Sequence, residues 1–493
     1  MRPSRKSALA LVLLVTSFPG EQTAARAQEP KPGAGVGVGD KARLTQLIRH
    51  SVDFFDASYH KDSGSYFSDV GHDGKPLTDR RHVVPSGRML YALAHASEID
   101  PKYKGRALGL RDYLLGTMTA NEAGVGPYFR GAVNGSGKEV VRHWDKDARK
   151  ALWPEQANPD LKVNEQAYGL CGLVALYAVD PTPDGLRRID EYYRAFRARF
   201  KDRGRGRTGF FSRYGLPGAA SPGPNATKNF DSTVYVGTAF LLELHAAAAR
   251  VAAAPGVDAG HRDLAAAVRD TAAADLTELA DAVADRMADA ADKTGFLVEH
   301  FDAEWKPAWP DDRKADGDTI GVVGHNFQAA WFLLRASELP AAKQSGRGAT
   351  YAAKAAGILT SMLARGEGRP VDFRRGGFRN GFLRAGGTMF GGWGGNKHWW
   401  QQAEGILALT LAERLKVRTT PDAAEVRDRA FQFFVDHFVD RQQGGEFDEV
   451  QEDGRRVVGE DMQPVDRPKG HAGKSAYHTV ELYRYLIRYA DPR

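Results

Sequence analysis

The chain has 493 residues, of which 42% are hydrophobic and 26% are charged, with a formal net charge of +6. This composition is typical of a globular protein with a large core. No Lys/Arg run alternates with aromatic residues, so we expect no nucleic-acid partner. The single cysteine, Cys171, excludes an intramolecular disulfide and any metal site built on cysteine.

Residues 1–27 have the pattern of a cleavable signal peptide. Basic residues around Arg5 precede an apolar stretch over residues 8–18, and the small residues before Glu29 fit cleavage near Ala27. The apolar stretch is too short for a comfortable bilayer span, so we expect no membrane span. Export without disulfides indicates a bacterial periplasmic or secreted protein.

Residues 28–40 are rich in proline and glycine and predict a flexible linker. The pattern becomes helical from residue 41, and we predict one domain over residues 41–493. Within it a glycine followed by aromatic residues recurs every 62 to 86 residues. The six glycines are Gly64, Gly126, Gly209, Gly295, Gly377 and Gly445. Each interval accommodates two helices, and turn residues after several of these glycines predict short β-hairpins.

Six such units predict an all-α fold, an (α/α)6 barrel in which six helical hairpins close into a ring. One helix of each pair should be buried on both sides and form the inner ring. The predicted inner helices are Val84–Ser97, Val163–Tyr177, Thr233–Ala246, Gly324–Ala336, Trp400–Ala412 and Tyr477–Ile487. Polar or aromatic residues stand near each N-terminal end, so these ends should line one mouth of the barrel.

Two histidines stand at equivalent positions in this pattern. His325 follows Gly324 at the start of an apolar helix, and His478 follows a glycine-rich loop at the start of the last one. Each taken alone fits a buried or capping histidine. A pair facing one ligand, in contrast, can remove a proton on one side and return one on the other.

Other motifs for catalysis are missing from the sequence or undecided. We find no Walker loop, no G-x-S-x-G and no H-E-x-x-H. Asp302, Asp311 and Asp312 are possible glycosidase carboxylates, but nothing in the sequence sets their separation. His398 and His437 show no metal-ligand spacing.

The motifs resemble the N-acylglucosamine 2-epimerase and cellobiose 2-epimerase superfamily, which also includes mannose and sulfosugar isomerases. The similarity extends from Val84 to Arg488, with matching order and spacing, and indicates a divergent, exported member. The matching pieces are Pro85–Ala94, Lys162–Leu170, Gly324–Trp331, Trp399–Glu404 and Tyr477-His478.

The resemblance implies an (α/α)6 barrel and a reaction without metal or cofactor. In that reaction His325 and His478 exchange a proton at C2 of an opened sugar through an enediol, while Arg88 stabilises the oxygen. The expected substrate-binding residues are Arg88, Tyr235, Gln328, Trp399, Trp400, Glu404 and Tyr477. Three positions depart from the family: Tyr235 lies in a stretch where many members have histidines, Gln328 replaces a glutamate, and His398 stands where relatives often have an acidic residue.

We therefore predict a sugar 2-epimerase or aldose–ketose isomerase acting on a mono- or oligosaccharide, as a monomer or homodimer. Two alternatives stay open. One is an exported glycoside hydrolase or polysaccharide lyase on the same barrel. The other is a carbohydrate-binding relative without catalysis.

Overall fold

A computed structural model describes residues 37–145, 150–288, 295–308, 314–315, 318–387, 389, 392–419, 422–457 and 467–490. Contacts divide the chain into Met1–Gly35 and Val36–Arg493, and the second unit holds all the described residues. The predicted signal peptide and most of the predicted linker lie outside the described residues. So do Asp311 and Asp312.

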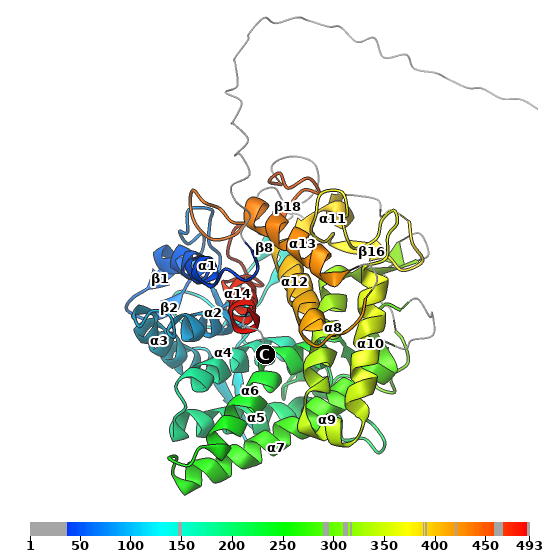
Figure 1. Ribbon diagram of the computed structural model, residues 1–493. Coiled ribbons are helices and arrows are strands. Elements are labelled where there is room, and N and C mark those ends of the chain that lie inside the picture. Colours follow the sequence, from blue (N-terminus) through cyan, green and yellow to red (C-terminus); the bar gives the residue numbers. More distant parts are fainter. Residues whose placement is uncertain are drawn as a thin grey trace, which may run out of the picture. The chain divides into compact units, whose positions relative to one another are not determined.

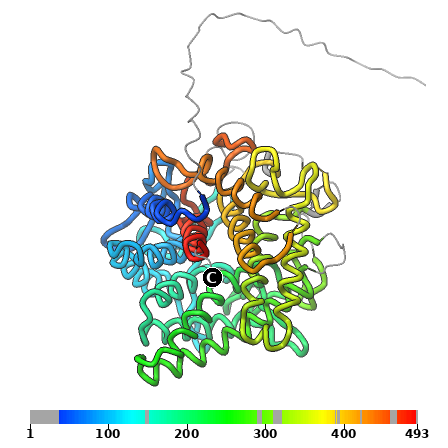
Figure 2. The backbone as a smooth tube through the Cα atoms, viewed as in Figure 1, coloured from blue at the N-terminus to red at the C-terminus, as the bar shows by residue number. Residues whose placement is uncertain are grey.

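Six pairs of helices form a ring, as predicted (Figures 1 and 2). The inner helices are α2 (Val83–Ala96), α4 (Val163–Val179), a helix made of η2 (Asp231–Tyr235), η3 (Gly237–Leu241) and α6 (Leu242–Ala253), α8 (Val323–Ser337), α12 (Trp399–Arg414) and α14 (Tyr477–Tyr489). The outer helices are α1 (Lys41–Asp53), α3 (Lys102–Gly116), α5 (Pro183–Phe200), α7 (Ala259–Ala282), α10 (Arg347–Met362) and α13 (Ala423–His437). Shorter helices are η1 (Phe54–Ser58), η4 (Val283–Met287), α9 (Pro340–Gln344) and α11 (Gly392–Gly395).

The chain runs once around the ring, so its last helix lies beside its first. Figure 2 shows the colours advancing from blue to red around the circle, with α14 next to α1. Neighbouring inner helices pack on each other, and α14 packs on both α12 and α2. Every residue of α8 except Arg335 is buried, which is the two-sided burial expected of an inner helix.

Short antiparallel strands join consecutive units near the starts of the inner helices. The pairs are β3 (Arg81–His82) with β6 (Ala132–Val133), β9 (Asp160–Lys162) with β10 (Arg213–Gly215), β12 (Thr227–Asn229) with β13 (His300–Asp302), β15 (Asp318–Val322) with β16 (Gly381–Leu383), and β17 (Lys397–His398) with β18 (Glu449–Val450). The ring is completed by a bridge between Val70 and Gly470. The other strands are β1 (Tyr59–His60) with β2 (Ser65–Tyr66), β4 (Thr119–Glu122) with β5 (Gly126–Phe129), β7 (His143–Asp145) with β8 (Lys150–Leu152), β11 (Gly223–Pro224) on β10, and β14 (Lys314–Ala315) on β15.

Inner and outer helices begin in different ways. Four outer helices, α1, α5, α7 and α13, have side-chain caps, as where Asp40 accepts from Arg43 N and Thr182 from Gly185 N. Inner helices have none, and the starts of the first five donate instead to a carbonyl of the following unit. Examples are Val323 N to Asn380 O at 3.1 Å and Trp399 N to Asp448 O at 3.1 Å. The strand segments between consecutive units therefore provide acceptors for N–H groups at the starts of the inner helices, which would otherwise be buried without partners.

The third inner helix differs from its prediction. It starts at Asp231 and ends at Ala253, and its first two stretches are π-helical. Thr233 and Thr238 donate their hydroxyls to carbonyls four residues earlier, at 3.0 and 2.9 Å. Such hydroxyls compete with the backbone N–H groups for those oxygens, which accounts for the widened turn.

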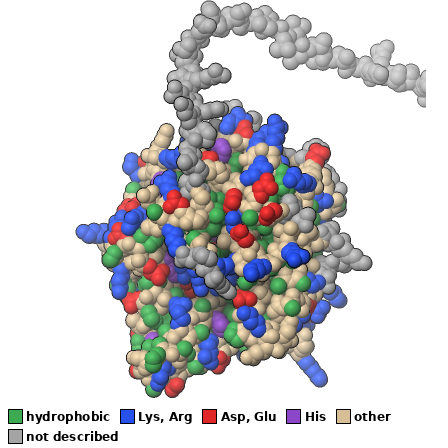
Figure 3. Space-filling model, in the orientation of Figure 1, with side chains coloured by type: hydrophobic (Ala, Val, Ile, Leu, Met, Phe, Trp, Pro, Cys, Tyr) green, Lys and Arg blue, Asp and Glu red, His purple; other side chains and the backbone are tan. Residues whose placement is uncertain are grey.

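The surface seen in Figure 3 carries charges of both signs, in agreement with the small net charge. Lys/Arg and Asp/Glu side chains are interspersed on the face in Figure 3, without a large patch of one sign. Among the described residues, only the helix Asp231–Ala253 is long and apolar enough to cross a membrane, judged by length and composition. It is an inner helix, and 61% of its apolar window is buried, as in core helices that pass the same test.

Candidate active site

Side chains from all six inner helices form a closed circuit of contacts near the ends where these helices begin. Each member lies against the next. The distances from the Arg88 guanidinium carbon to a ring centre, and between the centres of neighbouring rings, are 3.9 to 6.0 Å. In order, the members are Arg88, Tyr168, Tyr235, His325, Trp400 and the pair Tyr477-His478. The structure thus brings together most of the predicted site residues, which are spread over about 390 positions in the sequence.

His325 is held on several sides. Its Nδ1 lies 2.9 Å from Glu299 Oε2, and its Nε2 lies 3.2 Å from the Tyr235 hydroxyl. The Phe230 ring stacks on the imidazole at 3.9 Å with an angle of 15°. Only 11% of the His325 side chain is exposed. The imidazole therefore has a defined position, with Nε2 directed toward the circuit.

His478 is paired with Glu404 from the neighbouring helix. Its Nδ1 lies 3.0 Å from Glu404 Oε1, although the angle does not make a directed hydrogen bond. The other oxygen, Glu404 Oε2, accepts from the Trp331 indole N–H at 2.5 Å. Burial lowers the pKa of His478 well below its ordinary value, and the Arg88 charge acts in the same direction. At neutral pH His478 is therefore neutral and able to accept a proton.

Trp400 connects the two histidines. Its indole lies 5.6 Å from the His325 ring and 6.0 Å from the His478 ring. Its neighbour Trp399 contacts His478 at 5.9 Å and is buried. A ligand stacked beside Trp400 would therefore have an imidazole from α8 and another from α14 within reach.

Arg88 supplies the positive charge of the circuit. Its guanidinium lies over Tyr168 at 3.9 Å and donates to the Gly473 carbonyl, while its buried Nε has no partner. Its charge acts on both His478 and Glu404. A guanidinium with a free donor beside an imidazole is suited to stabilising an oxyanion.

Two predicted site residues are buried and make their hydrogen bonds to groups other than the two histidines. Gln328 is fully buried and donates from Nε2 to Thr238 at 3.0 Å, while its Oε1 has no partner. Tyr477 is buried and donates to Glu481 at 3.1 Å. Among the open alternatives, Asp302 caps a turn by accepting from the backbone of Glu304 at 2.9 Å.

Three residues of the site were not predicted from the sequence. Tyr168 and Glu299 are described above, and Glu481 lies one turn beyond His478 on α14. The Glu481 signal was available, because residues three apart share a helix face. Glu299 lies in an irregular segment just before β13, and no local pattern connects it with His325.

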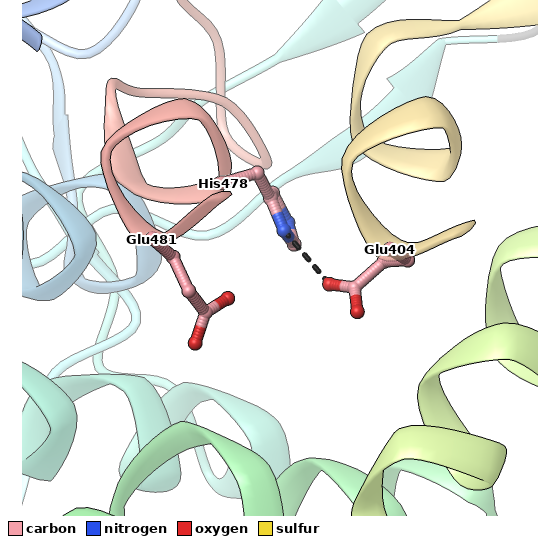
Figure 4. A group of neighbouring side chains, drawn as sticks. All are labelled: Glu404, His478 and Glu481. Carbon is pink, nitrogen blue, oxygen red and sulfur yellow. Dashed lines mark ion pairs between the residues drawn. The ribbon is translucent and has the colours of Figure 1, made fainter. Parts of the chain in front are cut away.

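Glu404, His478 and Glu481 form a buried group in which one donor atom of each lies within 4.8 Å of the others (Figure 4). Among the described residues only this group has the spacing of a metal site. Burial raises the pKa of Glu481 to about 8 and that of Glu404 well above its ordinary value, to which the Glu481 charge adds. The carboxylate pair therefore retains a proton at neutral pH.

Comparison of the sequence with known families gives one match. Residues 249–481 match the model of the family described as N-acylglucosamine 2-epimerase (GlcNAc 2-epimerase). This span contains both histidines of the circuit, together with Glu299, Trp400 and Glu404. No curated protein sequence matches the chain.

The barrel is similar to several solved structures. A D-mannose isomerase superposes with a TM-score of 0.69 at 16% identity, over 92% of this chain and 100% of the isomerase. A cellobiose 2-epimerase from Spirochaeta thermophila gives 0.65 at 17% identity, over 91% and 96%. A family 76 α-mannanase from Bacteroides thetaiotaomicron gives 0.51 at 12% identity, over 92% and 95%.

At these identities the structural similarity establishes the (α/α)6-barrel fold. The family match adds the relationship in sequence. Together they confirm the resemblance of this chain to the N-acylglucosamine 2-epimerase and cellobiose 2-epimerase superfamily, with the sequence match lying in residues 249–481.

Proposed function

We propose that the protein is a sugar 2-epimerase or aldose–ketose isomerase in which His325 and His478 transfer a proton at C2. The observation that carries this proposal is the contact of both imidazoles with Trp400 from two different inner helices. The family match supports a carbohydrate isomerase, and the similar mannose isomerase and cellobiose 2-epimerase agree with it.

In the proposed reaction the sugar opens to its aldehyde form, which makes the proton on C2 acidic. One imidazole accepts that proton, and the electron pair moves to the C1 oxygen to form an enediolate. Arg88 stabilises the developing negative charge on this oxygen. The other histidine returns a proton to the opposite face of C2, which gives the epimer. Where that histidine is His478, the proton retained by the Glu404–Glu481 pair replaces the one it gives. Return of the proton to C1 instead gives the ketose.

The test is deuterium incorporation from heavy water into a panel of free sugars. We expect exchange at C2 or C1 of at least one sugar. His325→Ala and His478→Ala should each lower the rate by about 10²–10⁴-fold, because that is the typical contribution of a positioned acid or base. His437→Ala, at the end of outer helix α13, is the matched control and should retain exchange.

Absence of exchange with every sugar tested would contradict the proposal. Release of reducing ends or unsaturated products from oligosaccharides would then indicate the hydrolase or lyase. Binding without turnover, measured by calorimetry, would indicate a carbohydrate-binding protein.

We also propose that the protein is exported after cleavage near Ala27. The support is the basic, apolar and small-residue order of residues 1–27. The N-terminal sequence of the protein isolated from a periplasmic or secreted fraction tests this. A start at Met1 would contradict it.

A further inference from the structure

Glu299 makes three separate contacts around His325. Its Oε2 lies 2.9 Å from His325 Nδ1, and its Oε1 accepts from the backbone N–H of Val322 at 3.5 Å. Its backbone carbonyl accepts from Phe230 N at 3.0 Å. One residue therefore holds the imidazole, the residue before α8, and the aromatic ring that stacks on the imidazole.

The environment of Glu299 makes this arrangement rigid. The residue is 2% exposed and adjoins β13, which pairs with β12 just before Phe230. Phe230 and Glu299 thus reach His325 from paired strands, one covering the ring face and the other meeting Nδ1. A side chain with this much support holds its partner at low entropic cost.

The chemistry of the contact determines which nitrogen is free. An ionised carboxylate only accepts hydrogen bonds, so a neutral imidazole bound to it carries its hydrogen on Nδ1. The lone pair is then on Nε2, where the Tyr235 hydroxyl can donate at 3.2 Å. This is the tautomer that accepts a proton from a substrate on the Nε2 side.

We propose that Glu299 is the positioning residue of His325: its carboxylate keeps the imidazole hydrogen on Nδ1 and so keeps Nε2 as the proton acceptor. This inference rests on the proposed function, in which His325 exchanges a proton with the sugar. It assigns the role to a residue outside α8.

Gln328 does not provide the same contact. It lies one turn after His325 on α8, where the family resemblance leads one to expect a glutamate. Its amide donates to Thr238 on the third inner helix instead. Gln328 therefore holds α8 against its neighbour, and the carboxylate at His325 comes from the segment before β13.

The first test is a direct measurement of the tautomer without substrate. Protein containing ¹⁵N-labelled histidine is studied by long-range ¹H–¹⁵N NMR at neutral pH, with His325 assigned by comparison with His325→Ala. Wild type should show the Nδ1–H form. Glu299→Gln replaces an acceptor with an amide that can donate to Nδ1, and should convert His325 to the Nε2–H form. Glu299→Asp keeps the acceptor and should retain the Nδ1–H form.

The second test is the kinetics of the same variants with a sugar that undergoes exchange. Glu299→Gln should lower kcat about 10²–10⁴-fold with KM changed by only a few-fold, because the wrong tautomer affects proton transfer and not binding. Glu122→Gln is the matched control. It removes a carboxylate that pairs with Arg199 at 2.9 Å outside the circuit, and should leave kcat unchanged.

These outcomes separate the two proposals. An unchanged tautomer in Glu299→Gln, or a kcat within about threefold of wild type, would overturn the role of Glu299 and leave the proposed function standing. Absence of exchange in wild type would overturn the proposed function, and the NMR measurement would still decide the tautomer. Recovery of kcat in Glu299→Gln/Gln328→Glu would show that a glutamate at position 328 can reach His325 Nδ1. That result would overturn the role assigned to Glu299.

Discussion

At the scale of single residues, the protonation of Glu481 should make the folding stability depend on pH. Burial raises the pKa of this carboxyl from the ordinary 4.5 to about 8. The Glu243 charge acts in the same direction, while Tyr477 and the Arg484 and Arg335 charges oppose it. The folded protein therefore holds this proton between pH 4.5 and 8, whereas the unfolded chain has lost it.

We predict that Glu481→Gln stabilises the protein at alkaline pH. Since the folded state binds more protons in that window, wild type loses stability as pH rises from 4.5 to 8. The glutamine cannot titrate, so the variant should gain on the order of 2–4 kcal/mol relative to wild type at pH 8.5 and little at pH 4.5. Urea unfolding at both pH values measures this. An equal difference at the two pH values would refute the assignment.

Site residues at the start of an apolar helix can be predicted from the sequence, whereas residues whose contacts depend on the packing of distant segments cannot. His325 and His478 were predictable because each opens an apolar helix after a glycine. Glu299 was not, since its contact with His325 depends on the pairing of β12 with β13. The sequence predicts Glu404 as a substrate contact. Its approach to His478 depends on how α12 and α14 pack.

At the scale of elements, α2 and α4 approach so closely that glycine is required. A Cβ on Gly87 would lie 1.9 Å from the Tyr168 carbonyl, and a Cβ on Gly172 would lie 2.6 Å from the Gly87 carbonyl. The two backbones are therefore in direct contact. The same contact places Arg88 over the Tyr168 ring.

We predict that Gly87→Ala is strongly destabilising. The clash is with backbone, which cannot rotate away, so the cost should be about 3 kcal/mol or more. Gly105→Ala, at an exposed position of α3 with open space for a methyl, is the control and should stabilise by about 0.5–1 kcal/mol. Chemical denaturation of both variants measures the difference. Equal stabilities would mean that the helices can separate without cost.

Helix bounds were predictable where the apolar pattern was regular. The predicted α8 and α12 begin within one residue of the observed helices. The third inner helix begins two residues before its predicted start and ends seven residues after its predicted end, and its first turns are π-helical, which the apolar pattern does not predict. The hydroxyls of Thr233 and Thr238 alter those turns only in their tertiary setting.

At the scale of the whole molecule, buried lysine–aspartate pairs recur from unit to unit. Lys397 is fully buried and lies 2.9 Å from Asp372, and Lys228 lies 2.7 Å from Asp202. Each lysine enters from the strand before an inner helix, and each aspartate follows an outer helix. The pairs therefore link the inner layer of helices to the outer layer.

We predict that Lys397→Met destabilises the protein by about 3–5 kcal/mol, because it leaves the Asp372 charge buried without its partner. Lys397→Met/Asp372→Asn should cost less than the sum of the single variants, because neither charge then remains alone. A double-mutant cycle in urea measures the coupling, with 1–3 kcal/mol expected. Additive effects would mean that the pair does not interact.

The contacts that close the ring should also be among the last to form when the barrel folds. The bridge between Val70 and Gly470 and the packing of α14 on α1 join residues about 400 positions apart. Contacts of such high order form late, since the intervening chain must be ordered first. His478 lies on this last helix, at the point of closure. A chain interrupted before Tyr477 therefore loses the closing helix and one of the two histidines together, so that barrel assembly and the proposed catalytic pair depend on the same final segment of synthesis.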